Sequence, residues 1–334
     1  MTRQTSGPDR FTFLRVFSVD LLLLLAVPFF TSAQGVPKEL AAHKQLFLET
    51  THGTLTLKEG PGGTLYVLNR SVPTSSVWIT DYSGISPRMI VSTAEYPELR
   101  APRDLAVDRD GNAIVLNGDG LIKIFSTDGK QVSSFQAERP HAVAVLSDGR
   151  ILVSGFPKEH LMTVYDRAGN LLTEIGEPAK VDTADLFDRR IMNMGSIVVD
   201  GDDNIYYIFR NLLTPTVREY TPDGNLVAEW HPEGAHLDWA VAQANKKIQK
   251  RQENGEHGAS AILTGGAFDA STKTLWLGSG EAVFQLDGLG HTIRSFSLTK
   301  SDGGPVQAFG LAVNAQFLCA TGPLHGTFEF IKPK

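Results

Sequence analysis

Beyond the first fifty residues, short runs of alternating apolar and polar residues are separated by turns rich in Asp and Gly. The clearest unit places four such runs at residues 102–108, 113–116, 121–125 and 131–135. A period of two is the pattern of a half-buried strand, and a turn such as Asp128-Gly129 is typical of a hairpin. The unit therefore predicts a four-stranded antiparallel meander.

This unit recurs along the chain. Clear copies cover residues 140–175 and 195–230, weaker copies cover 53–91 and 265–298, and a last copy at 309–331 supplies only three strands. A supersecondary unit repeated at a regular interval indicates a repeat architecture. Four-stranded units repeated around an axis make a β-propeller, in which only short, protected strand edges are left.

The last unit lacks an outer strand, and the run Gln45-Leu46-Phe47-Leu48-Glu49 can supply it. The sequence therefore predicts an all-β fold: a six-bladed β-propeller with four-stranded antiparallel blades, whose ring is closed by an N-terminal strand. Radial repetition explains how so much strand-forming sequence stays soluble.

Two insertions interrupt the repeats. Residues 177–190 are polar, and residues 231–261, before blade five, carry Leu237, Val241, Ala244 and Ile248 at helical spacing. That spacing predicts an amphipathic helix of about four turns. Both insertions precede a first strand, so they either form a lid over the central funnel or cover the side of the ring.

The N-terminus has the pattern of a secretory signal peptide. Three arginines precede an apolar run at 21–30, and small residues follow at 31–33. The run is too short for a membrane span of about 20 residues. We expect a signal peptide at 1–33, a propeller at 34–334 and a secreted or periplasmic protein without a span in its mature form. A retained anchor is the alternative.

The composition of the chain limits the kinds of partner and chemistry that we expect. The net charge of −6 is spread without a basic stripe, which excludes a typical nucleic-acid-binding surface. Cys319 is the only cysteine, so no intramolecular disulfide can form. Its apolar neighbours predict a buried, inert thiol. The common hydrolase and nucleotide-binding signatures are absent from the sequence.

The repeat resembles NHL-type six-bladed β-propellers over residues 45–334, most closely in blades two to four. The resemblance rests on the Pro and Ala-Val-Asp of residues 102–108, the Asp110-Gly111-Asn112 turn, the apolar second strand and Phe125 before Asp128. The family's Asn-x-Arg-Ile is replaced here by residues 117–122. A more distant resemblance links the chain to gluconolactonase-like and streptogramin-lyase-like propellers.

In propellers of this kind, ligands bind around the central channel, at the starts of first strands and in loops after second strands. The residues predicted to bind a ligand there are Arg103, Asn117, His141, Met194 and Arg210. The two arginines suit an anionic or polyhydroxylated ligand. The alternative is that each arginine pairs with a nearby carboxylate such as Asp104.

The resemblance to metal-dependent lyases implies a second interpretation, in which His52 and His141 are two ligands of a Ca or Zn ion. A catalytic zinc requires about three protein ligands, and no third is apparent. Glu59, in a Glu-Gly-Pro resembling that of gluconolactonase-like propellers, is better explained as a turn carboxylate. The same applies to the aspartates of residues 108–112.

The sequence thus predicts a ligand-binding or protein-interaction propeller that binds a small molecule, a peptide or another protein at its funnel, with no cofactor favoured. The alternative is a metal-dependent lyase or lactonase-like hydrolase acting in the funnel. Whether the chain is an enzyme, what its ligand is and how it oligomerises are left open by the sequence.

Overall fold

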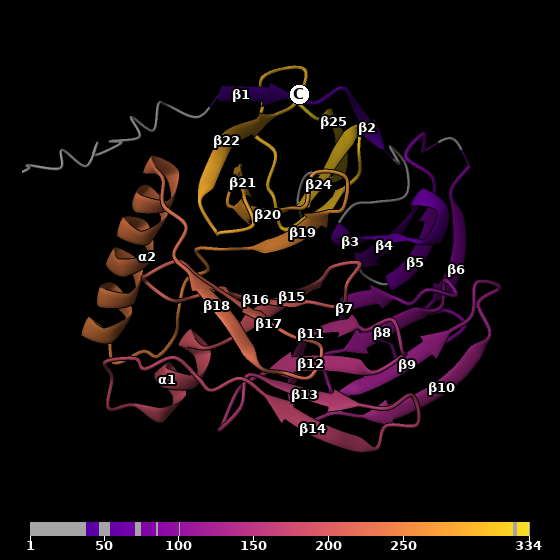
Figure 1. Cartoon of the computed structure of the whole chain (residues 1–334), viewed down its shortest axis with the longest axis horizontal. Helices are drawn as coiled ribbons and strands as arrows, with labels where there is room; N and C mark the ends of the chain where they lie inside the picture. The colour runs from indigo at the N-terminus through magenta and orange to yellow at the C-terminus, as the bar shows by residue number, and fades with distance from the viewer. Residues whose placement is uncertain are drawn as a thin grey trace, which may run out of the picture. The chain divides into compact units, whose positions relative to one another are not determined.

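The computed structural model describes residues 38–46, 54–70, 75–84, 86–99, 101–322 and 326–333. The expected signal peptide at 1–33 and the candidate ligand His52 lie outside the described residues. Within them the chain forms a six-bladed propeller of antiparallel blades, as the repeats predict (Figure 1).

Blades one to five each contain a meander of four consecutive strands, and blade six contains a meander of three. Blade one has β3 (Thr54–Gly60), β4 (Thr64–Arg70), β5 (Ser75–Thr80) and β6 (Arg88–Ser92), with the 3-10 turn η1 (Pro61–Gly63). Blade two has β7 (Pro102–Val107), β8 (Ala113–Asn117), β9 (Leu121–Phe125) and β10 (Gln131–Gln136). Blade three has β11 (Pro140–Val145), β12 (Ile151–Gly155), β13 (Met162–Tyr165) and β14 (Leu171–Ile175).

The second half of the ring repeats this order. Blade four has β15 (Gly195–Val199), β16 (Ile205–Phe209), β17 (Thr216–Tyr220) and β18 (Leu226–Trp230). Blade five has β19 (Gly265–Asp269), β20 (Thr274–Ser279), β21 (Ala282–Leu286) and β22 (Thr292–Thr299), and blade six has β23 (Gly310–Val313), β24 (Phe317–Gly322) and β25 (Gly326–Ile331). The first strands contact one another in sequence around the axis, and β23 returns to β3.

The N-terminal segment closes the ring. Strand β2 (Lys44–Leu46) pairs antiparallel with β25, with Lys44 opposite Glu329, and becomes the outer strand of blade six. This confirms the predicted donor strand, whose last residues, 47–49, lie outside the described residues. Strand β1 (Lys38–Ala41), which the sequence did not predict, pairs parallel with β22 and adds a fifth strand to blade five.

The core lies between the blades. Buried side chains fall into six described clusters, and each joins two neighbouring blades; Val143 and Ile114, for example, meet between blades two and three. All five residues of β8 and all five of β16 are buried, because both faces of these second strands are covered. Cys319 is fully buried and unpaired, as predicted.

The Asp-rich turns hold themselves together. Asp108 Oδ1 accepts hydrogen bonds from the backbone N of Asp110, at 3.0 Å, and of Asn112, at 2.8 Å. Asp166 and Asp200 repeat this arrangement in blades three and four. These hydrogen bonds from the local backbone to the side chain explain why aspartate occupies the turns. The interpretation of these aspartates as turn residues is confirmed.

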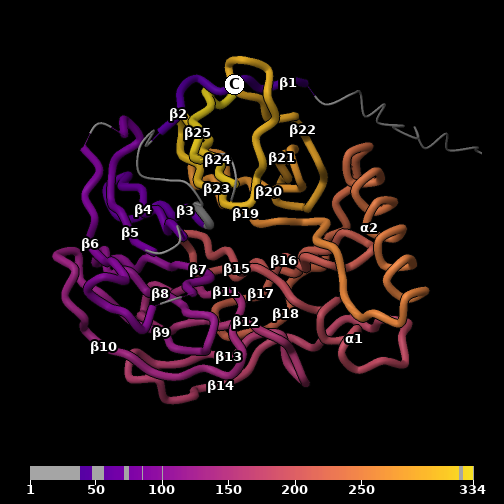
Figure 2. Tube along the Cα trace, turned by 180° about the vertical axis from the view of Figure 1, so that it is seen from behind, coloured from indigo at the N-terminus to yellow at the C-terminus, as the bar shows by residue number. Residues whose placement is uncertain are grey.

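The insertions carry two helices. Helix α2 (Ala235–Glu253) confirms the amphipathic helix predicted in the second insertion, whereas α1 (Leu186–Met192) in the first was not predicted. Leu237 and Ala244 of α2 pack with Trp230 and Leu275 of blades four and five. Two opposite views place α2 at the outer edge of the ring (Figures 1 and 2). No helix among the described residues is long and apolar enough to cross a membrane.

Candidate functional site

The central channel opens into a cavity of about 380 Å³ at the end where the first strands begin. All six blades contribute to its wall; the lining residues are Thr56, Leu57, Lys58, Arg70, Arg103, Asp104, His141, Ala142, Ser196, Ile197, Arg210, Thr264, Gly265, Gly266, Phe309, Gly310 and Leu311. We call this cavity the funnel. Its residues come from segments far apart in the sequence, which the ring brings together.

The two sides of the funnel differ chemically. Blades five and six present backbone, because their lining residues include glycines with no room for a side chain. A Cβ on Gly265 would lie 2.5 Å from the carbonyl O of Phe309, and one on Gly310 would lie 2.9 Å from Cα of Thr56. The charged side chains come from blades one, two and four, and blade three contributes His141. A ligand therefore meets polar groups on one side and a backbone wall on the other.

Arg210 and His141 form the polar centre of the funnel. Arg210 Nη1 lies 2.6 Å from Nε2 of His141. A guanidinium can only donate, so Nε2 accepts and the proton of the neutral ring resides on Nδ1. Burial, followed by the charges of Arg210 and Arg103, lowers the pKa of His141 to about 3. The imidazole is therefore neutral at physiological pH.

The position of Arg210 is fixed by its own backbone. Its N–H donates to the carbonyl O of Met194 at 3.0 Å, and its carbonyl accepts from the N–H of Ile262 at 2.7 Å. Burial lowers the pKa of Arg210, and the charge of Asp104 opposes that change. Its Nε is buried and has no hydrogen-bond partner among the described residues. The funnel thus contains a buried donor without an acceptor.

Arg103 is exposed on the funnel wall and makes no ion pair with any carboxylate of the described chain. Its neighbour Asp104 instead accepts a hydrogen bond from the backbone N–H of Val143, at 2.9 Å. Lys58 and Arg70 add two more cations to the same cavity, whose described lining includes a single carboxylate, Asp104. The funnel is strongly positive.

Three of the five predicted ligand-binding residues, Arg103, His141 and Arg210, lie together in the funnel. Asn117 and Met194 are not among its lining residues. Asn117 is 2% exposed, and its amide bonds to the backbone of Ala101 and Glu98 and to Asp119. Asn117 thus shapes the wall of blade two, and Met194 holds the backbone of Arg210.

Sequence reasoning missed Lys58 and Arg70. Arg70 ends β4 in blade one, the place in the repeat next to that of Arg210, which follows β16 in blade four. A comparison of the ends of second strands could have found it.

Glu59 lies near the end of β3, just before η1. Its Oε2 accepts a hydrogen bond from Tyr82 Oη at 3.1 Å, and burial raises the pKa of its carboxyl group. It lines a cavity of about 170 Å³ farther along the channel, whose lining residues are mostly apolar.

A larger cavity of about 970 Å³ lies beside the outer strands of blades three and four, but its arginine and both of its histidines have local partners. Arg218, which lines it, donates from Nε to Glu229 and from Nη1 to the carbonyl of Glu177, each at 2.5 Å. His160 and His231 each face a glutamate. The funnel, with unpaired cations and a buried free donor, is the stronger candidate for a ligand site.

No protein-family model matches the chain, and no curated protein matches it by sequence. Among solved structures, a gluconolactonase from Xanthomonas campestris is similar with a TM-score of 0.56 and 14% identity, covering 85% of this chain and 87% of that one. A streptogramin B lyase is similar with a TM-score of 0.52 and 13% identity, covering 87% and 86%. Similarity at this level of identity shows a shared propeller fold.

Proposed function

We propose that this chain is a ligand-binding propeller whose funnel takes up a small organic anion with a carboxylate or phosphate group. The observation that carries the proposal is the excess of positive charge in the funnel, where Lys58, Arg70, Arg103 and Arg210 face the single described carboxylate of Asp104. Arginine offers a planar fork of donors that matches the oxygens of carboxylates and phosphates.

The size and the unfulfilled bonding of the funnel support this assignment. A volume of about 380 Å³ lies in the range of small-molecule pockets. The buried Nε of Arg210 lacks an acceptor in the described chain, and such a donor costs about 1–3 kcal/mol. Arg210 lines the funnel, and an anionic oxygen that reached this atom would satisfy it. The backbone wall of blades five and six leaves space on the opposite side for the rest of the ligand.

The described funnel residues do not fit a divalent metal ion. Nε2 of His141 already accepts from Arg210. Two guanidiniums repel positive charge at this imidazole, which is one reason why its pKa is low, and they would repel a metal cation in the same way. The same electrostatics favour an anion. We therefore place binding of an anion before the alternative of metal-dependent lyase or lactonase-like chemistry.

Calorimetric titration of the full-length, tag-free chain with citrate tests the proposal, with xylitol as an uncharged probe. Citrate should bind and xylitol should not. Arg103→Gln should weaken citrate binding at least about tenfold, since a charge-assisted hydrogen bond contributes roughly 1.5–3 kcal/mol. Arg109→Gln removes another exposed arginine, from the β7–β8 turn outside the funnel, and should leave binding unchanged.

Two results would reject the proposed function. One is the absence of citrate binding at millimolar concentration, and the other is equal affinity in the wild type and Arg103→Gln. Binding of Zn²⁺ or Ca²⁺ that is lost in His141→Ala would instead support the metal-dependent enzyme.

We also propose that the protein is exported and cleaved after Ala33. The N-terminal sequence pattern supports this, and so does the position of the first strands. β1 begins at Lys38 and β2 at Lys44, so this cleavage would leave both ring-closing strands in the mature chain. Intact-mass measurement of the protein from the extracellular or periplasmic fraction should give a chain that starts at Gln34.

A further inference from the structure

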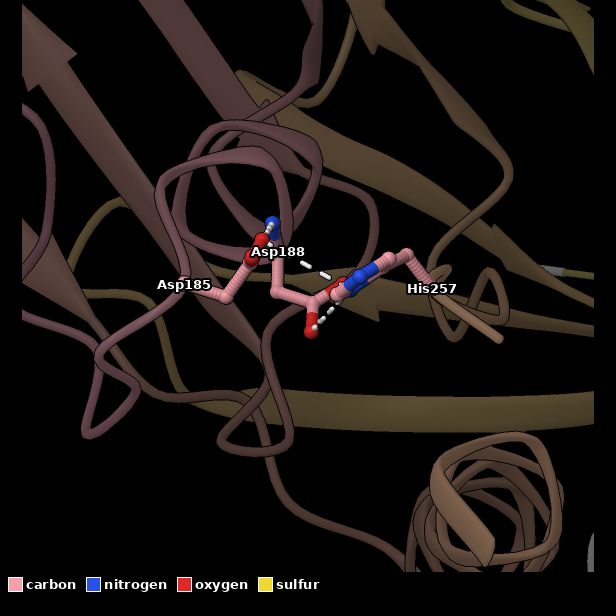
Figure 3. Close-up of side chains that lie close together, drawn as sticks. All are labelled: Asp185, Asp188 and His257. Carbon is pink, nitrogen blue, oxygen red and sulfur yellow. Dashed lines mark hydrogen bonds and ion pairs between the residues drawn. The ribbon is translucent and has the colours of Figure 1, made fainter. Parts of the chain in front are cut away.

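The two insertions meet at a cluster of three side chains outside the funnel. Asp185 is the N-cap residue of α1, Asp188 lies in the first turn of α1, and His257 follows the end of α2. Figure 3 shows the imidazole of His257 directed toward both carboxylates. It is the one group of this kind among the described residues whose ligand atoms lie within 4.8 Å of one another.

The distances in this cluster match those around a bound metal. Nδ1 of His257 lies 3.3 Å from Oδ2 of Asp188 and 3.6 Å from Oδ1 of Asp185. Zinc binds imidazole N and carboxylate O at about 2.0–2.2 Å in tetrahedral geometry, which sets ligand atoms roughly 3.3–3.6 Å apart. The imidazole therefore already stands from both carboxylates at the separations that a tetrahedral ion requires, and the ligand atoms of all three residues lie within 4.8 Å of one another.

We propose that Asp185, Asp188 and His257 bind one Zn²⁺ ion, with water in the fourth position. The imidazole favours zinc over calcium and magnesium, which prefer all-oxygen sites. The two carboxylates together balance the charge of the ion. This site shares no residue with the funnel and does not depend on the proposed function.

The ligands are held in place from both sides. Asp185 Oδ1 accepts from the N–H of Asp188 at 2.8 Å, and Asp188 Oδ1 accepts from the N–H of Gly258 at 3.2 Å. The loop after α2 is fixed because Arg251 Nη1 donates to the carbonyl of Ala259 at 2.6 Å. The metal would therefore bind to a largely formed site, with little ordering cost.

Zinc at this position would join two segments that are distant in the sequence. The first insertion links blades three and four, and the second links blades four and five. A metal bridge between α1 and the end of α2 would hold the two connections together beside blade four. The proposed role is thus a clamp on the insertions, and the open fourth position leaves room for an additional ligand.

The test is calorimetric titration of the full-length, tag-free chain with Zn²⁺ at pH 7.5, in the wild type and in two matched variants. His257→Gln removes the imidazole from the cluster. His291→Gln is the control, because His291 is also exposed and its Nδ1 lies 3.2 Å from a single carboxylate, that of Asp287. Equal melting temperatures without zinc would establish that both variants fold.

We expect one zinc ion per chain, at least about tenfold weaker binding in His257→Gln, and unchanged binding in His291→Gln. Hydrogen exchange should show zinc-dependent protection at residues 183–188 and 255–258. Equal zinc affinity in the wild type and His257→Gln would overturn the proposal. The absence of binding, or protection confined to other segments, would do the same.

Discussion

Arg210 donates from Nη1 to Nε2 of His141 across 2.6 Å, and this bond joins the loop after the second strand of blade four to the first strand of blade three. It sets the chemistry of the funnel in two ways. Together with burial, which is the larger cause, it keeps the imidazole neutral, and it holds one guanidinium in the channel at a fixed orientation. A positive cavity with a neutral histidine is suited to an anion.

The lowered pKa of His141 should make stability depend on pH. Its pKa is about 3 in the folded chain against an ordinary value of 6.5, so the unfolded chain takes up a proton that the folded chain does not. The stability linked to this group is complete above pH 6.5 and is lost as the pH falls toward 3. Between pH 7 and pH 5 the loss should be about 1–2 kcal/mol.

Urea denaturation at the two pH values measures this loss. His141→Gln keeps an acceptor for Arg210 but does not titrate, so its free energy of unfolding should change less than that of the wild type. Other titrating groups contribute equally to both proteins. Parallel pH dependence in the two proteins would show that His141 is not held neutral by its surroundings.

The stability of the closed ring should depend on the side chain of Lys44. Its Nζ lies 3.4 Å from Oε1 of Glu329, whose side chain is 1% exposed, and it also donates to the carbonyl of Ser83 at 3.1 Å. Burial raises the pKa of Glu329, and the charge of Lys44 opposes this. Lys44→Gln leaves a buried carboxylate without its cation, so unfolding should become easier by about 1–3 kcal/mol.

Chemical denaturation of two further variants gives the comparison. Lys38→Gln, at an exposed position of β1, should change stability by less than about 0.5 kcal/mol. The double variant Lys44→Gln with Glu329→Gln should recover part of the loss, because it removes the unpaired charge. A full loss in the double variant would mean that the charge of Glu329 is not responsible.

Helix α2 should stabilise the ring without taking part in ligand binding. Leu237 is 1% exposed in the cluster between blades four and five, and no residue of α2 lines the funnel. Leu237→Ala should lower the free energy of unfolding by about 2–4 kcal/mol. Citrate affinity, measured by calorimetry well below the melting temperature, should stay the same.

Trp239 on the same helix provides the control, since it is 64% exposed. Trp239→Ala should leave both stability and citrate affinity close to those of the wild type. A tenfold loss of affinity in either variant would favour the interpretation of the second insertion as a lid.

The sequence predicts most of the fold because the information is local and repeated. Alternating runs and Asp-Gly turns specify each blade, and the missing outer strand of blade six points to a donor near Leu46. Strand β1 escaped prediction because blade five already has its four strands, so the repeat leaves no gap that would indicate a fifth. Helix α1 has only seven residues, too few for a clear period.

The candidate site was predicted only in part. Position in the repeat places Arg103, His141 and Arg210 at the same end of the channel. It does not reveal that Arg210 donates a hydrogen bond to His141. Nor does it reveal that Asp104 accepts from the backbone of Val143, or that the side chain of Asn117 makes only local hydrogen bonds. These outcomes depend on side-chain directions, which follow from the closed ring. The Asp185–Asp188–His257 cluster depends likewise on how the two insertions meet.

The most direct test of an anion-binding funnel is a crystal structure of the chain soaked in tungstate, with tungsten located by its anomalous scattering. We expect a tungstate in the funnel with oxygens within hydrogen-bond distance of Arg103 and of Nε of Arg210, and no such peak in Arg103→Gln crystals. Tungstate bound only at other surfaces, with the funnel empty in the wild type, would contradict it.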